Sequence, residues 1–154
     1  MLATVQRVSQ AKIFVDKKIF SSIGLGCLVF VCVEKDDTSQ SIKDMVSKIL
    51  NFRMLDGPKG ITTSALKDSS EEVLIVSQFT LVGKLLKGNR PSFENSKSPD
   101  IAKDMLNNIV KEFANHLTVK TGSFGAMMDV GLVNDGPATF VLNAKNGQLI
   151  DQAD

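Results

Sequence analysis

Short apolar runs of strand length, broken by only two stretches of helical period, constrain the fold of this chain more than any other feature. The runs lie at residues 2–8, 11–15, 18–23, 27–33, 72–81, 118–121, 126–133 and 138–142. Apolar side chains recur instead at every third or fourth position over residues 38–54, and again along a stretch that begins with Ser98 and Pro99. That spacing predicts two amphipathic helices among the strands.

The order of these elements predicts an α/β fold in a single domain. Neither strands nor helices can bury an apolar face alone, so we expect two packed sheets covered by two helices. A length of 154 residues fits one domain. Residues 1–143 should form that domain, whereas residues 144–154 are small and polar and should form a flexible C-terminal tail.

Composition excludes several classes of function. Eighteen Lys and Arg against seventeen Asp and Glu give a formal net charge of +1, so a nucleic-acid partner would have to be held at a local patch. The longest apolar run, residues 27–33, is too short to span a bilayer, and the first residues do not resemble a signal peptide. We therefore expect a cytoplasmic protein without membrane association. With one histidine, His116, and two cysteines, neither a metal site nor a bound cofactor is expected.

Residues 77–80 come directly after the four apolar residues 73–76 of their run, and three of the four are polar. Ser77 and Thr80 supply hydroxyl groups and Gln78 supplies an amide. Backbone N–H groups at the point where a strand leaves the core can face a developing oxyanion. The alternative is a strand end whose Ser and Thr side chains bond their own backbone.

Gly136 and Pro137 form a second candidate. An X-Pro bond can be cis at small energetic cost, and a glycine before it removes the side-chain clash. The alternative is an ordinary tight turn. Arg7, near the end of the first apolar run, could also reach a polar pocket.

A long loop without periodicity is predicted over residues 82–99. It contains three cations, Lys84, Lys87 and Arg90. These either bind phosphate groups or are simply solvated side chains.

Two segments together closely resemble the signature motifs of the D-aminoacyl-tRNA deacylases. They are Ser77-Gln78-Phe79-Thr80-Leu81 and Asn134-Asp135-Gly136-Pro137-Ala138-Thr139. The similarity extends to residues 5–8, 33–38, 48–53, 87–93 and 124–128, and so covers nearly the whole chain up to about Asn143. Ala138 departs from the family pattern, which has Val after Gly-Pro, and residues 82–86 are more apolar than the family's usual loop.

The resemblance implies a three-layer β/β/α domain that acts as a homodimer with active sites at the subunit interface. Such enzymes hydrolyse the ester bond of D-aminoacyl-tRNA and of mischarged glycyl-tRNA, releasing free amino acid and tRNA, and reject L-aminoacyl-tRNA. Their Gly-Pro peptide is cis and enters the neighbouring subunit's pocket. By this resemblance, Gly136 and Pro137 would present their carbonyl oxygens to the amino group and Cα of the substrate. We assign Arg7 to substrate binding with them.

Ser77, Gln78, Phe79 and Thr80 are the expected catalytic residues. Thr80 is the obvious side-chain nucleophile, but no histidine or lysine is obviously placed to activate it. The resemblance favours a route in which N–H groups near Phe79 and Thr80 bind the oxyanion while water attacks with help from the 2′-OH of the RNA. The nucleophilic role of Thr80 therefore stays open. Phe79 would position the terminal adenosine or close the pocket, Ser77 and Gln78 would shape it, and the basic loop would contact the acceptor end of the tRNA.

Two alternatives remain. A paralogous editor of L-aminoacyl- or glycyl-tRNA would use the same fold with a trans Gly-Pro peptide, although Asp135 and Thr139 favour the D-specific branch. A non-catalytic nucleic-acid-binding homodimer would show decayed versions of the two motifs beside stronger basic clusters, and the sequence has neither.

Overall fold

The computed structural model describes residues 1–85, 88–145 and 148–150. Its elements in chain order are β1 (Leu2–Val15), β2 (Lys18–Ile23), β3 (Gly26–Cys32), α1 (Ser39–Asn51), β4 (Arg53–Gly57), β5 (Gly60–Ala65), the 3₁₀ helix η1 (Leu66–Asp68), β6 (Glu72–Ser77), the 3₁₀ helix η2 (Phe79–Val82), α2 (Pro99–Ala114), β7 (Val119–Thr121), β8 (Asp129–Lys145) and β9 (Gln148–Ile150). The protein is a mixed α/β structure, as the sequence predicts.

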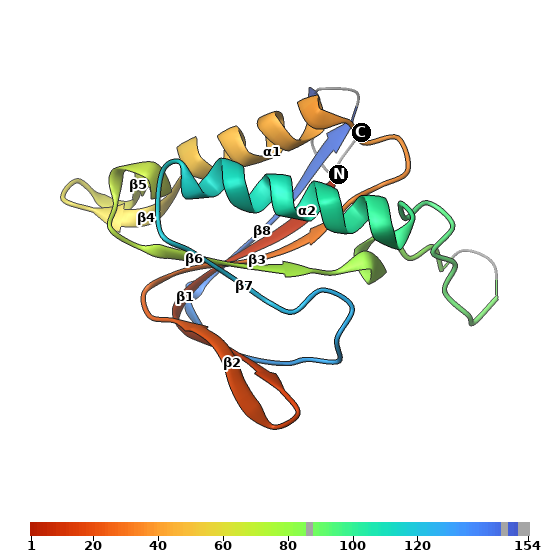
Figure 1. The fold of residues 1–154 in the computed structure, drawn as a ribbon. Coiled ribbons are helices and arrows are strands. Elements are labelled where there is room, and N and C mark those ends of the chain that lie inside the picture. The colour runs from red at the N-terminus through yellow and green to blue at the C-terminus, as the bar shows by residue number, and fades with distance from the viewer. Residues whose placement is uncertain (86–87, 146–147, 151–154) are drawn as a thin grey trace.

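One large mixed sheet organises the molecule. Its strands follow the order β7-β6-β3-β1-β8-β9, and β2 pairs with β1. The β3–β6 and β6–β7 ladders are parallel and the others are antiparallel. β4 and β5 form a separate two-stranded hairpin. In Figure 1 the two helices lie together over one face of the large sheet, and the hairpin lies beside the C-terminal end of α1.

Both helices begin within one residue of their predicted starts. The Thr38 side chain accepts a hydrogen bond from the Gln40 N–H (3.2 Å), and the Ser41 hydroxyl accepts one from the Thr38 N–H (3.1 Å), which makes a capping box. α1 ends at Asn51, before the predicted residue 54, because β4 follows almost at once. α2 begins with Pro99. In the part of the chain that the structure describes, neither helix is long and apolar enough to cross a membrane.

The apolar stripes of the helices pack on the sheet to form the larger core, which includes Val5, Val29, Met45, Ile49, Ile75, Ile109 and Phe113. A second core lies on the opposite face and draws on four strands of the same sheet: its buried residues are Val8, Ala11, Ile13, Ile23, Leu28, Leu74 and Val76. One sheet that curls on itself thus takes the place of the two packed sheets expected from the sequence. β1 is continuous over fourteen residues and has register shifts against β8 on both sides of Val8, where a strand can bend.

The C-terminal segment differs from the predicted flexible tail. β8 continues to Lys145 and pairs with β9, antiparallel to it. Ala144 is buried, its N–H donates to the Met1 carbonyl (2.9 Å), and its own carbonyl accepts from the Met1 ammonium group (2.7 Å). The prediction is therefore wrong for Ala144, Lys145 and residues 148–150, because backbone pairing orders a segment whose side chains are small and polar. Residues 146–147 and 151–154 lie outside the described part of the chain.

Candidate active site

Residues 77–80 occupy the turn where β6 leaves the sheet. Ser77 ends β6, the Gln78 N–H donates to the Val31 carbonyl (2.8 Å), and η2 starts at Phe79. The Phe79 side chain is 54% exposed and meets the ring of Phe93 edge to face, with ring centroids 5.1 Å apart. Phe93 therefore anchors the predicted basic loop against this turn, while the exposed part of the Phe79 ring remains available to a ligand.

Two consecutive backbone donors lie in this turn. They are the N–H groups of Phe79 and Thr80, which have no acceptor within the described residues. The N–H groups that follow are paired: Leu81 donates to the Gln78 carbonyl (3.2 Å) and Gly83 donates to the Thr80 carbonyl (3.0 Å). Unpaired N–H groups next to an exposed hydroxyl are suited to stabilising an oxyanion.

The Thr80 hydroxyl is exposed and lies within hydrogen-bond range of the Gln78 amide. Among the described residues, no basic side chain contacts this hydroxyl. His116 lies elsewhere, in a surface groove along the helices with Lys43 and Glu112.

Gly136 and Pro137 lie inside β8, and the peptide bond between them is cis. The Asn134 side chain braces the turn: its amide nitrogen donates to the Arg7 carbonyl (3.1 Å) and the Ala138 carbonyl (3.0 Å), and its oxygen accepts from the Ala138 N–H (3.1 Å). Gly136 has φ +130°, and a Cβ there would lie 2.9 Å from the Arg7 guanidinium. Only glycine fits this position.

Arg7 lies directly against this turn and is 8% exposed. Its Nε donates to the Asp135 carbonyl (3.0 Å) and lies 3.2 Å from the Asp135 carboxylate. Its Nη1 donates to the Met54 carbonyl (3.1 Å) and to Asp56 Oδ1 (3.0 Å). The same Asp56 oxygen accepts from the Thr62 N–H (3.1 Å). The Thr62 N–H, and after it Arg7, hold the pKa of Asp56 below its ordinary value. Arg7 thus ties the β4–β5 hairpin to the β8 turn.

A shallow surface pocket of about 300 Å³ opens beside the turn. It is lined by Arg7, Ile61, Thr62 and residues 136–140. The Ile61 side chain is 76% exposed. Asn134 belongs to a motif that the sequence singled out, but Asp56 and Thr62 carried no sequence signal, because their segment lacks strand-like alternation.

The two motifs lie apart within one protomer. Ser77 is level with Val31 of β3 and Ala3 of β1, whereas the 136–137 turn lies beside Arg7. The separation along the sheet is four residues, roughly 13 Å, and three strand spacings, roughly 14 Å. The structure therefore brings Arg7 to Gly136 and Pro137, and keeps residues 77–80 together, but does not unite the two groups.

Two of the three predicted loop cations lie within the described residues. Lys84 pairs loosely with Glu94 (3.6 Å between Nζ and Oε1) and is half exposed. Arg90 is exposed. Lys87 falls outside the described residues. In the described part of the chain, no cluster of three or more His, Cys, Asp and Glu side chains is placed to hold a metal ion.

Comparison with known proteins gives consistent results. The family model described as D-Tyr-tRNA(Tyr) deacylase matches residues 4–143. The D-aminoacyl-tRNA deacylase of Thermosipho africanus is 47% identical over 146 residues, covering 94% of this chain and 98% of the relative. The enzyme of the same name from a Sulfurihydrogenibium species is 43% identical over 145 residues, covering 94% and 99%.

Two solved structures are also similar. One, titled c-Myc DNA Unwinding Element Binding Protein, superposes with a TM-score of 0.89 at 36% identity, covering 94% of this chain and 99% of that one. Another, described as a probable eukaryotic D-amino acid tRNA deacylase, has a TM-score of 0.80 at 17% identity and covers 91% and 97%, which shows a shared fold.

Proposed function

The chain belongs to the D-aminoacyl-tRNA deacylase family, and from that premise we propose that it removes D-amino acids and mischarged glycine from tRNA while sparing L-aminoacyl-tRNA. D-aminoacyl-tRNA deacylation, a hydrolase activity in proofreading, follows from the homology. The glycine activity and the chiral filter are the finer part of the proposal. Its site of action would be the cytoplasm, where charged tRNA is used.

The Gly136–Pro137 backbone is suited to act as the chiral filter. D and L isomers differ in the direction in which the side chain leaves Cα, so a fixed main chain beside Cα can exclude one hand. Three hydrogen bonds hold this backbone, one from Arg7 to the Asp135 carbonyl and two between the Asn134 side chain and Ala138. Two carbonyl oxygens of the turn would accept from the substrate's ammonium group. A site that works by steric rejection cannot refuse glycine, which has no side chain.

The chemistry requires a nucleophile and stabilisation of the tetrahedral intermediate. We propose that water attacks the ester carbonyl carbon and that the 2′-OH of the terminal ribose assists. The oxyanion would be bound by the N–H groups of Phe79 and Thr80, and the intermediate would then collapse by releasing the ribose 3′-oxygen, which takes up a proton. The observation that carries this step is the pair of adjacent N–H groups without acceptors in the described residues.

A second copy of the chain would complete the site. Because residues 77–80 and the 136–137 turn lie apart in one protomer, a substrate that touches both must lie between two protomers. Val133 and Val141 on β8 are each 48% exposed, and they offer apolar surface for such a contact. Lys84, Lys87 and Arg90 would contact phosphates of the acceptor end, which is the local patch that a net charge of +1 requires.

Release of labelled amino acid from D-Tyr-tRNA, L-Tyr-tRNA and Gly-tRNA, at matched enzyme concentration, tests the proposal. The expected result is rapid loss of the D and glycine esters while the L ester stays intact. A Pro137→Ala variant should lose both the discrimination and most of the deacylation activity, because the same turn would hold the substrate's ammonium group. No loss of any ester from a folded dimer would overturn the enzymatic assignment, and loss of the L ester by the wild type would favour the paralogous editor.

Nucleic-acid binding without catalysis is a second candidate, favoured by the similarity to the structure titled c-Myc DNA Unwinding Element Binding Protein. Fluorescence anisotropy with a labelled AT-rich DNA duplex separates the two candidates. DNA binding without ester hydrolysis would support the second one. Ester hydrolysis without DNA binding would remove it.

A further inference from the structure

We infer that Cys32 is a positioning residue for the Thr80 N–H, one of the two backbone donors of the 79–80 turn, an inference that rests on the proposed function of that turn. Cys32 ends β3 and is 1% exposed. Its Sγ lies 3.6 Å from the Phe79 carbonyl oxygen, within hydrogen-bond range for sulfur, and 3.8 Å from the Val33 carbonyl oxygen. The thiol is thus the buried group beneath the proposed oxyanion site.

The contact between the Cys32 thiol and the Phe79 carbonyl also sets the direction of the Thr80 N–H. The Phe79 carbonyl and the Thr80 N–H belong to one planar trans peptide unit, so they point in opposite directions. A thiol that holds the carbonyl toward the buried side therefore directs the Thr80 N–H away from it, toward the exposed side of the turn where the ester would bind. If the carbonyl were free to rotate, the N–H would rotate with it.

The thiol is in the protonated form that this role needs. Burial, and after it the negative charge of Glu34, raises the pKa of Cys32 to about 11. At neutral pH the sulfur therefore carries its proton and can donate it to the carbonyl.

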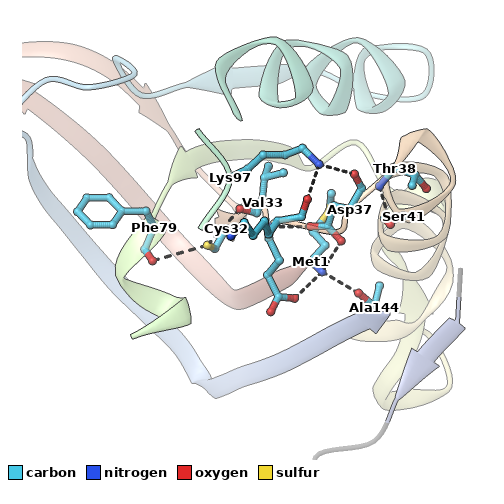
Figure 2. A network of polar contacts seen from close by, with 11 residues as sticks. Met1, Cys32, Val33, Asp37, Thr38, Ser41, Phe79, Lys97 and Ala144 are labelled. Carbon is cyan, nitrogen blue, oxygen red and sulfur yellow. Dashed lines mark hydrogen bonds and ion pairs between the residues drawn. The ribbon is translucent and has the colours of Figure 1, made fainter. Parts of the chain in front are cut away.

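The residues that follow Cys32 in the chain belong to the polar network shown in Figure 2. The Met1 ammonium group donates to Glu34 Oε2, Asp37 Oδ1 and the Ala144 carbonyl, each at 2.7 Å. Asp37 Oδ2 in turn accepts from the Glu34 N–H (2.7 Å).

Lys97 closes the network from the other side. Its backbone N–H donates to the Val33 carbonyl (3.1 Å), and its Nζ donates to the Asp37 carbonyl (2.7 Å). Because the residues just after Cys32 are held by these contacts, the position of the thiol is fixed independently of the turn it contacts.

Cys27 provides a matched control in the same strand. It is fully buried like Cys32, but its Sγ contacts the Met54 sulfur (3.1 Å) and lies at the opposite end of β3. Replacing Cys27 therefore tests the cost of removing a buried thiol from β3, without the contact to the turn.

The experiment compares Cys32→Ala, Cys32→Val, Cys32→Ser and Cys27→Ala, in the full chain, by deacylation kinetics with D-Tyr-tRNA. We expect Cys32→Ala and Cys32→Val to lower kcat roughly three- to tenfold, the effect of one modest hydrogen bond, with KM changed less than about twofold. Cys32→Ser retains a donor and should recover part of the loss. Cys27→Ala should leave kcat unchanged. Equal kcat in Cys32→Val and Cys27→Ala, or no recovery with serine, would overturn the inference.

Amide hydrogen exchange supplies a readout that does not depend on catalysis. Exchange in a peptide covering residues 77–83 should be faster in Cys32→Val than in Cys27→Ala. If the wild type releases no amino acid, the proposed function fails while the exchange comparison still tests the contact. Unchanged exchange in Cys32→Val would overturn the positioning role even where the wild type is active.

Discussion

The guanidinium of Arg7 is almost enclosed by protein, and its acceptors come from two distant segments. Met54 and Asp56 belong to the β4–β5 hairpin, while Asp135 belongs to the turn in β8. A planar fork with fixed donor directions suits such a set, whereas the point charge of a lysine does not. The sequence allowed that Arg7 could reach a polar pocket, but its partners could not be predicted, because nothing local brings a residue near position 55 to residue 7.

Replacement of Arg7 by lysine should therefore destabilise the protein. We expect Arg7→Lys to lower the free energy of unfolding by about 2–3 kcal/mol, since the buried Met54 carbonyl and the partly buried oxygens of Asp56 and Asp135 lose a donor. Urea denaturation measures the change, and Arg53→Lys, at an exposed position in β4, is the control. Equal stability of the two variants would contradict this account of Arg7.

Asp56 should make a pH-dependent contribution to stability. The Thr62 N–H, and after it Arg7, lower the pKa of Asp56 in the folded protein. The ionised carboxylate therefore stabilises the folded state fully above its ordinary pKa of 3.8, and this contribution is lost as the pH falls through the lower pKa of the folded state. The difference in unfolding free energy between wild type and Asp56→Asn should therefore be constant near neutrality and shrink below about pH 3.8. Urea denaturation at pH 7 and pH 3 tests this, and a constant difference would contradict it.

Thr80 has an exposed hydroxyl and no basic neighbour in the described residues, so its side chain should matter little to the rate. We expect Thr80→Ala to keep kcat within about threefold of wild type, against the thousandfold or larger loss expected for a nucleophile. Single-turnover release of D-tyrosine measures it. A loss of that larger size, from a protein with normal thermal unfolding, would instead make Thr80 the nucleophile.

At the scale of elements, periodicity decided what could be predicted. Both helices have a 3.6-residue pattern and capping residues, so their positions were predicted closely. The β4–β5 hairpin was missed because its residues do not alternate, and η2 was included in a strand because its sequence continues an apolar run. The polar pair at residues 9–10 similarly suggested a break in β1, whereas these residues follow a register shift within one long strand.

The capping box of α1 gives a prediction at this scale. Thr38→Ala removes the acceptor for the Gln40 N–H and should lower the free energy of unfolding by about 1 kcal/mol. Ser39→Ala, one residue later and exposed, should change it by no more than about 0.5 kcal/mol. Thermal unfolding of both variants measures the difference, and an equal effect would show that the Thr38 cap contributes nothing.

At the scale of the whole molecule, local patterns leave the number of sheets open. Apolar residues on both faces of β1, β3 and β6 fit two stacked sheets as well as one sheet that covers part of its own face. Long-range pairing distinguishes them, and it also separates the two motifs within a protomer. The residues of the candidate site could therefore be proposed from the sequence, whereas their division between two places on the sheet could not.

The proposed sharing of the site between two protomers predicts complementation. Phe79→Ala and Pro137→Ala each damage one half of every site in their own dimers. A mixed dimer of the two would have one site with both defects and one with neither. Co-expression should thus restore about a quarter of wild-type deacylation, because half of randomly formed dimers are mixed and each has one intact site. Activity no greater than the average of the two variants would place the whole site within one protomer.

The pairing of β1 with β8 also sets the timing of folding during synthesis. Leu2 lies opposite Asn143 and Phe14 opposite Asp129, so one edge of the first strand is covered by nearly the last strand made. At about 5–20 residues per second, a ribosome needs several seconds to produce β8 after β1 has emerged. β2 and β3 can pair with β1 in that interval, but the other edge stays open to pairing with a neighbouring nascent chain. Folding is therefore completed only after residues 129–145 leave the ribosome, and any pause late in translation lengthens the period in which this chain is prone to aggregate.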